Sequence, residues 1–338
     1  MMTILVGILL FGLLIFVHEL GHFLTARLFG IKVHAFSVGM GPAIWKKEHS
    51  GIEYSIRVLP IGGYVKLEGE DEKSDDPSAF GNKSPIARIL VLFAGGFMNV
   101  LIGFLIFVLV FSSVKHVSVP IVDSVVSGSP AESAGILPGD EIIKMNGQSI
   151  HIQNDVSLAL MKNGSNPITV VVQRGHETVS MTVTPHYDSG NGSFILGFYP
   201  QIQTMKPGLA VKTAFHNTFF VVKLVYFSLG EMLSGNVKLA DMAGPVGIVN
   251  EMNAVAKSEM PLLNMLNFMG LIAVNLGVMN LLPIPALDGG RIFFVLVELL
   301  RRKPIKPEHE GLIHFIGFAL LILLMLLITF SDIKKLFT

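Results

Sequence analysis

Long apolar runs separated by polar segments dominate the hydrophobic pattern of this chain. A helix needs roughly 20 mostly apolar residues to cross the hydrocarbon core of a bilayer. Four runs meet that length, at residues 3–28, 86–111, 263–300 and 312–330. The pattern therefore predicts a polytopic α-helical membrane protein with about four transmembrane helices.

A fifth stretch, residues 214–232, is less apolar because it carries His216, Asn217, Lys223 and Glu231. We interpret it as an amphipathic helix on the membrane surface, with a fifth span as the alternative. The first apolar run has no basic segment before it and no small-residue cleavage site. We therefore expect it to be a retained helix and not a signal peptide.

Residues 117–200 have a different pattern. Gly, Pro, Ser and Asp punctuate short β-branched runs, which lie at 120–126, 141–145, 168–173 and 179–184. Such a pattern is typical of short strands joined by turns, and residues 155–161 fit a short helix. We therefore predict a small α+β domain inserted between the second and third spans.

Composition agrees with a membrane protein and limits the chemistry. Of the 338 residues, 51% are hydrophobic and 15% are charged, whereas soluble domains carry about 25% charged residues. The formal net charge is zero, so no basic field indicates nucleic-acid binding. Because the chain has no cysteine, disulfides and thiolate metal sites are excluded, and a metal must be bound by His, Asp or Glu.

The distribution of basic residues predicts the orientation in the membrane. They gather between the first two spans and before the fourth, at Arg27, Lys32, Lys46, Lys47, Arg57, Lys66, Lys73, Lys83, Arg88, Arg301, Arg302, Lys303 and Lys306. The positive-inside rule places both loops in the cytoplasm. Residues 112–262 and both termini then lie outside it, although Lys334 and Lys335 argue weakly against this orientation.

The first span contains the run His18-Glu19-Leu20-Gly21-His22. Residues four apart share one helical face, so both imidazoles can reach one ion. Glu19 lies beside them and can deprotonate a water bound to that ion. Ionisable residues within a membrane helix are costly and usually functional. A polar patch between helices or a proton path is the alternative.

The third span supplies a candidate third ligand. Pro283 and Pro285 break its helix, and irregular backbone at membrane depth must line a cavity or be buried in protein. Asp288 can therefore point inward, and the glycine pair after it allows close backbone approach. Alone, such a run would be a loop turn. With His18 and His22 it completes the three ligands that catalytic zinc sites use.

Together these motifs resemble the site-2 protease family of intramembrane zinc metalloproteases, of the M50 type. The resemblance implies one zinc ion per chain, bound by His18, His22 and Asp288, with Glu19 as the general base. It also places Asn280 near the bound substrate backbone. The chain departs from the family where Gly95-Gly96 stands in place of the usual Gly-Pro before Asn99.

Two further segments carry the resemblance. Residues 129–143, followed by Asn146-Gly147, resemble the bacterial PDZ signature and indicate an RseP-like branch with a single PDZ domain. Residues 36–66 resemble the family's membrane-associated β-hairpin, with Gly39-Met40-Gly41 as its turn. The hairpin edge could bind an unwound substrate by strand addition. A hairpin with no substrate role and a PDZ-like spacer with no ligand are the alternatives.

These features predict a polytopic helical membrane protein with a membrane-associated β-hairpin and an inserted α+β PDZ-like domain. The expected segments are 1–30 (first transmembrane helix), 31–84 (hairpin region), 85–112 (second transmembrane helix), 115–200 (PDZ-like domain), 205–260 (amphipathic surface helix and connector), 261–300 (third, broken transmembrane helix), 301–310 (cytoplasmic loop) and 311–331 (fourth transmembrane helix). The other histidines, including His314 of the fourth span, occur singly, so we expect surface or packing roles for them.

The resemblance implies a multi-pass enzyme of the bacterial inner membrane that cleaves transmembrane segments. Its substrates would be single-span proteins already trimmed by another protease, such as anti-sigma factors or signal-peptide remnants. The PDZ-like domain would lie outside the cytoplasm and bind a peptide or chain end, with the active site toward the cytoplasmic side. A membrane receptor or scaffold with a structural metal is the alternative, and a transporter is a third possibility, although no inverted repeat is visible.

Overall fold

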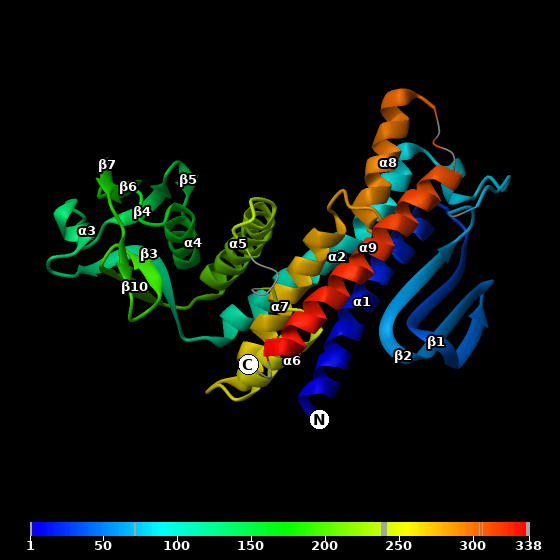
Figure 1. The fold of residues 1–338 in the computed structure, drawn as a ribbon, viewed down its shortest axis with the longest axis horizontal. Helices are drawn as coiled ribbons and strands as arrows, with labels where there is room; N and C mark the ends of the chain where they lie inside the picture. The colour runs from blue at the N-terminus through cyan, green and yellow to red at the C-terminus, as the bar shows by residue number, and fades with distance from the viewer. Residues whose placement is uncertain (1, 71, 238–241, 304, 306, 336–338) are drawn as a thin grey trace. The chain divides into compact units, whose positions relative to one another are not determined.

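The structure is a computed structural model that describes residues 2–70, 72–237, 242–303, 305 and 307–335. The chain forms two compact units (Figure 1). Unit 1 comprises residues 1–106 and 225–338, and unit 2 comprises residues 107–224. Of the basic residues used to predict the orientation, Lys306 lies outside the described residues.

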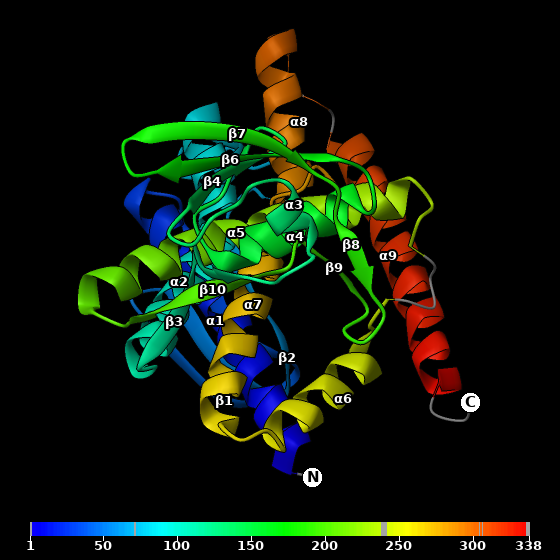
Figure 2. The same ribbon diagram turned by 90° about the vertical axis from the view of Figure 1, so that its left-hand side faces the viewer.

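Unit 1 is mainly helical (Figure 2). Among the described residues, four stretches are long and apolar enough to cross a membrane, namely Gly7–Leu28 of α1 (Met2–Leu28), Pro85–Ser113 (α2), Pro261–Asn280 (α7) and Glu308–Lys335 of α9 (Pro307–Lys335). On α9, large apolar side chains such as Phe315 are mostly exposed, as lipid contact requires. The prediction of four apolar helices long enough to cross a membrane is confirmed.

The other helices within the described residues are shorter or less apolar. They are α3 (Pro130–Ser133), α4 (Gln153–Asn163), α5 (Pro207–Leu233), α6 (Pro245–Ala256), α8 (Asp288–Arg301) and the 3-10 turn Phe80–Asn82. α5 contains the fifth stretch, and it is not among the four candidate spans. The break between α7 and α8 falls at the two prolines, because neither can continue a regular helix.

Glycines bring the helices of unit 1 close together. A Cβ on Gly277 of α7 would lie 2.6 Å from the carbonyl oxygen of Gly96 of α2, and a Cβ on Gly96 would lie 2.8 Å from the carbonyl oxygen of Gly277. Small residues at such crossings let two backbones approach within a membrane. This crossing holds α2 against α7, directly before the broken segment.

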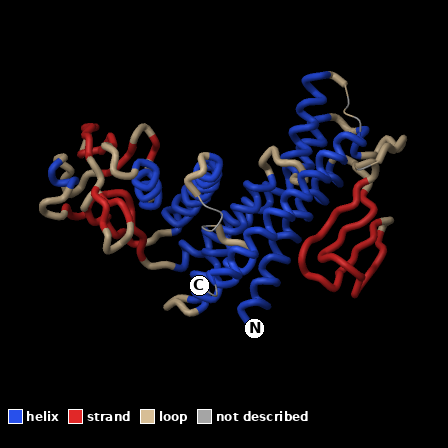
Figure 3. The backbone as a smooth tube through the Cα atoms, in the orientation of Figure 1, coloured by secondary structure: helices blue, strands red, loops and turns tan. Residues whose placement is uncertain are grey.

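A strongly curved sheet of β1 (Val33–His49) and β2 (Ile52–Leu67) completes unit 1 (Figure 3). Residues 43–49 pair with 52–57, while residues 35–38 have residues 63–66 on one side and 53–56 on the other. The connection between the strands is at Ser50 and Gly51, which have positive φ. The predicted turn at Gly39-Met40-Gly41 is therefore wrong in position. Its glycines, with φ of +88° and +84°, bend β1 within its own length.

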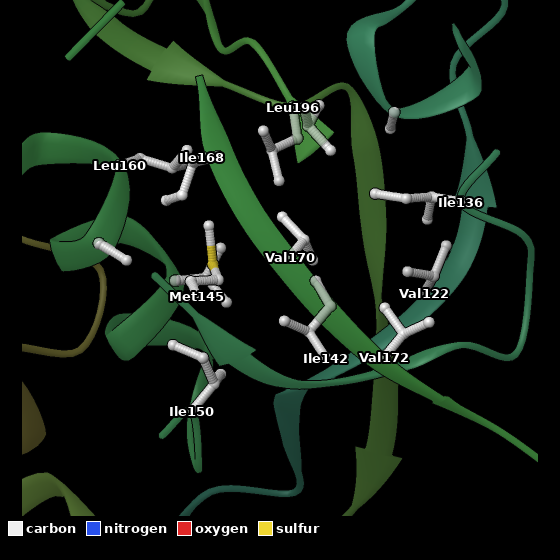
Figure 4. Packing of buried hydrophobic residues seen from close by; sticks show 14 residues of the cluster. Val122, Ile136, Ile142, Met145, Ile150, Leu160, Ile168, Val170, Val172 and Leu196 are labelled. Carbon is white, nitrogen blue, oxygen red and sulfur yellow. The ribbon is translucent and has the colours of Figure 1, made fainter. Parts of the chain in front are cut away.

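Unit 2 contains a sheet in the order β10-β3-β4-β6-β7, with β5 paired to β4. The strands are β3 (His116–Val125), β4 (Glu141–Met145), β5 (Gln148–Ser149), β6 (Ile168–Arg174), β7 (Glu177–Val183) and β10 (Phe198–Thr204), and a separate hairpin pairs β8 (His186–Asp188) with β9 (Ser193–Ile195). The four predicted strand runs and the helix are confirmed. They enclose one apolar core that includes Ile142, Met145 and Val170 (Figure 4).

An ion pair with a buried carboxylate ties the end of β6 to the turn just before β4. The guanidinium of Arg174 donates from Nε and Nη2 to the two carboxylate oxygens of Asp140, both at 2.7 Å. Asp140 is only 1% exposed, and burial alone would raise the pKa of its carboxyl. The bonds from Arg174 and from the Leu137 amide outweigh burial, so the pKa of Asp140 lies below its usual range.

We expect Arg174→Met to destabilise unit 2 by about 1–3 kcal/mol at pH 7, because it leaves a buried carboxylate without its main partner. The pKa of Asp140 is lowered in the folded state. The ionised carboxylate therefore contributes its full stabilisation of the fold above the unfolded pKa of about 4. This contribution is lost as the pH falls through the folded pKa. Hydrogen exchange of β4 and β6 from pH 7 to pH 3 measures both effects. Glu177→Gln, at an exposed site on β7, is the matched control, and equal protection in the two variants would contradict the expectation.

Candidate metal centre

Three side chains from two distant helices converge on one point of unit 1. The Nε2 atoms of His18 and His22 are 3.1 Å apart, and Oδ2 of Asp288 lies 3.1 Å from the first and 3.3 Å from the second. A tetrahedral zinc ion with ligands at about 2.0–2.1 Å holds them about 3.3 Å from one another. The triangle therefore has the dimensions of one face of a zinc tetrahedron.

The protonation of His22 is fixed by its second nitrogen. Its Nδ1 lies 2.8 Å from the carbonyl oxygen of Val91, which can only accept, so Nδ1 carries a proton. When the imidazole is neutral, as a metal ligand must be, its Nε2 lone pair faces Asp288. The Oδ2 atom of Asp288 is buried and has no hydrogen-bond partner among the described residues. Unprotonated ligand atoms that face one another at this spacing fit a cation between them.

Two amides hold the ring of His18. The Nδ2 atoms of Asn99 and Asn280 each lie 3.5 Å from His18 Nδ1. The oxygen and nitrogen of an amide are assigned from its contacts. If His18 Nδ1 carries the ring proton, either amide can be rotated by half a turn, so that its oxygen accepts a hydrogen bond from that N–H. The Oδ1 atom of Asn99 is buried without a hydrogen-bond partner, so turning this amide also satisfies that oxygen. Such outer contacts orient metal-binding histidines.

Local backbone geometry delivers Asp288 to the histidines. Asp288 is the first residue of α8, and the chain before it folds back tightly on the start of that helix. A Cβ on Gly290 would lie 2.9 Å from the carbonyl carbon of Ile284, closer than real side chains approach. Ala286 has φ of +76°, a conformation that is costly for any residue with a Cβ. The glycine pair is therefore required for the loop to close.

Glu19 is half-buried between the histidines and strand β2. The backbone amide of Val65 favours the charged form of its carboxylate, and Glu19 interacts electrostatically with both histidines and with Asp288. A Cβ on Gly63 would lie 3.0 Å from Glu19 Cγ. The bare backbone of β2 therefore packs directly on the Glu19 side chain and limits where it can lie.

The remaining predicted site residues divide into two groups. Asn280, the last residue of α7, lies at the cluster, next to His18. Gly39, Met40 and Gly41 lie in the bend of β1 and are not part of the ligand cluster. Arg57 holds the bend, since its Nη1 donates to the carbonyl oxygen of Gly41 at 2.7 Å.

Sequence reasoning assigned no role in the site to three residues of α2. Val91 orients His22, Asn99 orients His18, and Gly95 leaves room for both rings. A Cβ on Gly95 would lie 2.7 Å from His22 Cε1 and 2.8 Å from His18 Cε1. These residues are spaced by four, which places them on one helical face. That spacing, together with the unusual Gly-Gly pair, is the signal that could have identified them.

A charged cavity of about 440 Å³ also lies in unit 1. Arg88 and Glu298, which form an ion pair at 2.7 Å, line it together with Arg291 and Glu70. The described residues that line this cavity do not include His18, His22 or Asp288. It is therefore separate from the ligand cluster.

Comparisons with known proteins agree with the geometry. Residues 6–324 match the model of peptidase family M50. A protein of Clostridium acetobutylicum named as a zinc metalloprotease is 38% identical over 98% of this chain and 97% of its own length. One of Clostridium perfringens with the same kind of name is 39% identical over 98% of both chains. The regulator of sigma-W protease RasP of Bacillus subtilis is 29% identical over 99% of both.

Proposed function

Since the chain belongs to peptidase family M50, the site-2 protease family of zinc metalloproteases, we propose that it cleaves transmembrane segments of membrane proteins that another protease has already trimmed. The observation that carries the proposal is the convergence of His18, His22 and Asp288. The two histidines stand on a helix apolar enough to span a bilayer. A hydrolytic site at such a position acts on peptide bonds that lie within the membrane or at its surface.

The proposed roles follow from the contacts. His18, His22 and Asp288 would hold zinc, which supplies Lewis acidity to the attacking water and to the scissile carbonyl when bound. The Glu19 carboxylate takes a proton from that water and delivers one to the nitrogen of the leaving amine. The Val65 amide keeps Glu19 in place, and Asn280 orients His18 and contacts the substrate backbone.

A transmembrane substrate must unwind before cleavage, because a helix hides its carbonyls in internal hydrogen bonds. Residues 63–67 form an edge of the β1–β2 sheet, with residues 33–38 as their partner. An extended substrate segment added to this edge would lie beside Glu19, since Gly63 packs on that side chain. The bend at Gly39, Met40 and Gly41, where Met40 and Gly41 are exposed, would guide the same segment.

Unit 2 supports a proposal about partners. Strand β10 lies at the edge of its sheet, and Tyr199 and Ile202 on it are more than 60% exposed. We assign the predicted range 115–200 to a PDZ-like domain outside the cytoplasm, which binds a peptide or new chain end along this edge. The basic loops place the enzyme in the bacterial inner membrane with its active site toward the cytoplasm.

The substrate class extends what the name of one relative says. The Bacillus subtilis protein is a regulator of sigma-W, and we propose membrane-bound anti-sigma factors or signal-peptide remnants as substrates here. The alternative of a receptor with a structural metal predicts four protein ligands. Among the described residues the cluster has three, which favours hydrolysis.

Purified protein in liposomes tests the proposal with one single-span substrate, supplied full-length and without its extracytoplasmic domain. We expect cleavage of the trimmed form at a bond within its apolar segment, located by mass spectrometry. A chelator should abolish cleavage and one equivalent of zinc should restore it. Equal cleavage of both forms would contradict the requirement for trimming. Cleavage of a soluble protein but not of either membrane substrate would contradict the proposed substrate class.

A further inference from the structure

His314 of α9 contacts the loop that carries the third ligand, although its isolated position in the sequence suggested only packing. The backbone N–H of Ala286 donates to His314 Nδ1 at 2.8 Å. Ala286 stands two residues before Asp288. We propose that His314 is a positioning residue that holds this loop, and through it Asp288, in the geometry that binds zinc. The inference rests on the proposed role of Asp288 and extends the site to the fourth span.

The loop needs an external support at this position. Ala286 has φ of +76°, a conformation that is unfavourable for a residue with a side chain. The surrounding structure must hold it there. The bond from the Ala286 amide to His314 satisfies a half-buried donor and fixes the strained residue at the same time.

Packing around His314 supports the same role. A Cβ on Gly317, three residues further along α9, would lie 2.5 Å from Pro285 Cβ and 2.8 Å from the carbonyl oxygen of Pro285. α9 therefore meets the loop through a histidine and a glycine on one face. On the other side, the ring of His314 lies 5.4 Å from the ring of Phe294 of α8, between centroids. The histidine thus lies between the loop before Asp288 and the helix after it.

The chemistry of the contact distinguishes this role from simple filling of space. An amide N–H can only donate, so His314 Nδ1 must accept and the ring proton is on Nε2, which lies 3.9 Å from Oε1 of Glu310. The Oδ1 atom of asparagine can occupy the place of Nδ1 and accept the same bond. The amide oxygen of glutamine stands one bond further out and cannot, although glutamine fills more of the space.

The test compares His314→Asn, His314→Gln and His314→Leu in the full-length protein, with His309→Leu as the control at an exposed site of α9. Zinc affinity is measured by competition with a chelator, and the melting temperature is measured without metal. We expect zinc affinity to fall by about 10–100-fold in the glutamine and leucine variants, as for other groups that orient ligands. The asparagine variant should stay within about threefold of the parent, and the control should be unchanged.

The same variants separate positioning from general stability. Glutamine loses the bond to Ala286, so we expect its metal-free melting temperature to lie only slightly below that of the asparagine variant, while the zinc affinities of the two differ clearly. In a cleavage assay, kcat should follow the zinc affinity measured at limiting metal, and KM should not change. Parent-like zinc affinity in the leucine variant would overturn the proposal. So would an asparagine variant as weak as the leucine one. Zinc affinity and melting temperature do not depend on the identity of the substrate, so the failure of the proposed function would be a separate result.

Discussion

The Glu19→Gln enzyme is expected to bind zinc like the parent and to cleave its substrate about 10²–10⁴-fold more slowly, the usual contribution of a general acid–base group. Glutamine keeps the size of the side chain and can accept the hydrogen bond from the Val65 amide. It cannot take a proton from water at any ordinary pH. Because none of the three ligand atoms changes, the metal content should stay at one zinc per chain.

Metal analysis and single-turnover cleavage of a trimmed substrate check this expectation together. Glu53→Gln is the matched control, since Glu53 of β2 pairs with Lys46 outside the ligand cluster and exposed ion pairs contribute little. That control should cleave at the parent rate. A Glu19→Gln enzyme that retains zinc and cleaves as fast as the parent would refute the proposed role of Glu19.

The Gly95→Ala variant is expected to lose zinc and, with it, all detectable cleavage. The added methyl would lie under 3 Å from carbons of both imidazole rings, closer than non-bonded carbons can approach. His22 cannot move aside without breaking its hydrogen bond to the carbonyl oxygen of Val91, which lies on α2 like Gly95. Alanine favours a helix over glycine by about 1 kcal/mol, so lower helix propensity would not explain the loss.

Gly103→Ala is the control for general disturbance of α2. A Cβ there would lie 2.6 Å from Val274 Cγ2 and 3.0 Å from the carbonyl oxygen of Gly270, so it disturbs the crossing with α7 and not the imidazoles. We expect a lower melting temperature with zinc still bound. Chelator competition and thermal melting of both variants separate the two effects. A Gly95→Ala protein that binds zinc with parent affinity would contradict the structure of the site.

The parts of the site that sequence could predict are those with a local pattern. Two histidines four residues apart share a helical face wherever the helix lies, and prolines in an apolar run mark a break wherever it packs. Both signals are complete within about ten residues. The family prediction, which rests on them, is confirmed by the match over residues 6–324.

The contributions of α2 and α9 could not be read in this way. Gly95, Asn99 and His314 have their roles only because a second helix packs against them. The sequence of one helix does not show which other helix it packs against. The turn between β1 and β2 was predicted at the wrong place for a related reason. A Gly-x-Gly run supplies positive φ equally well to a turn between strands and to a bend within one, and only the pairing with β2 distinguishes them.

The ligands of the metal centre come from opposite ends of the chain, with His18 in α1 and Asp288 at the start of α8. About 270 residues separate them, which at 5–20 residues per second takes the ribosome on the order of ten seconds to a minute. A newly made chain therefore carries an incomplete hydrolytic centre while its first helices enter the membrane. The set of three ligands is therefore complete only when all but about the last 50 residues of the polypeptide have been made.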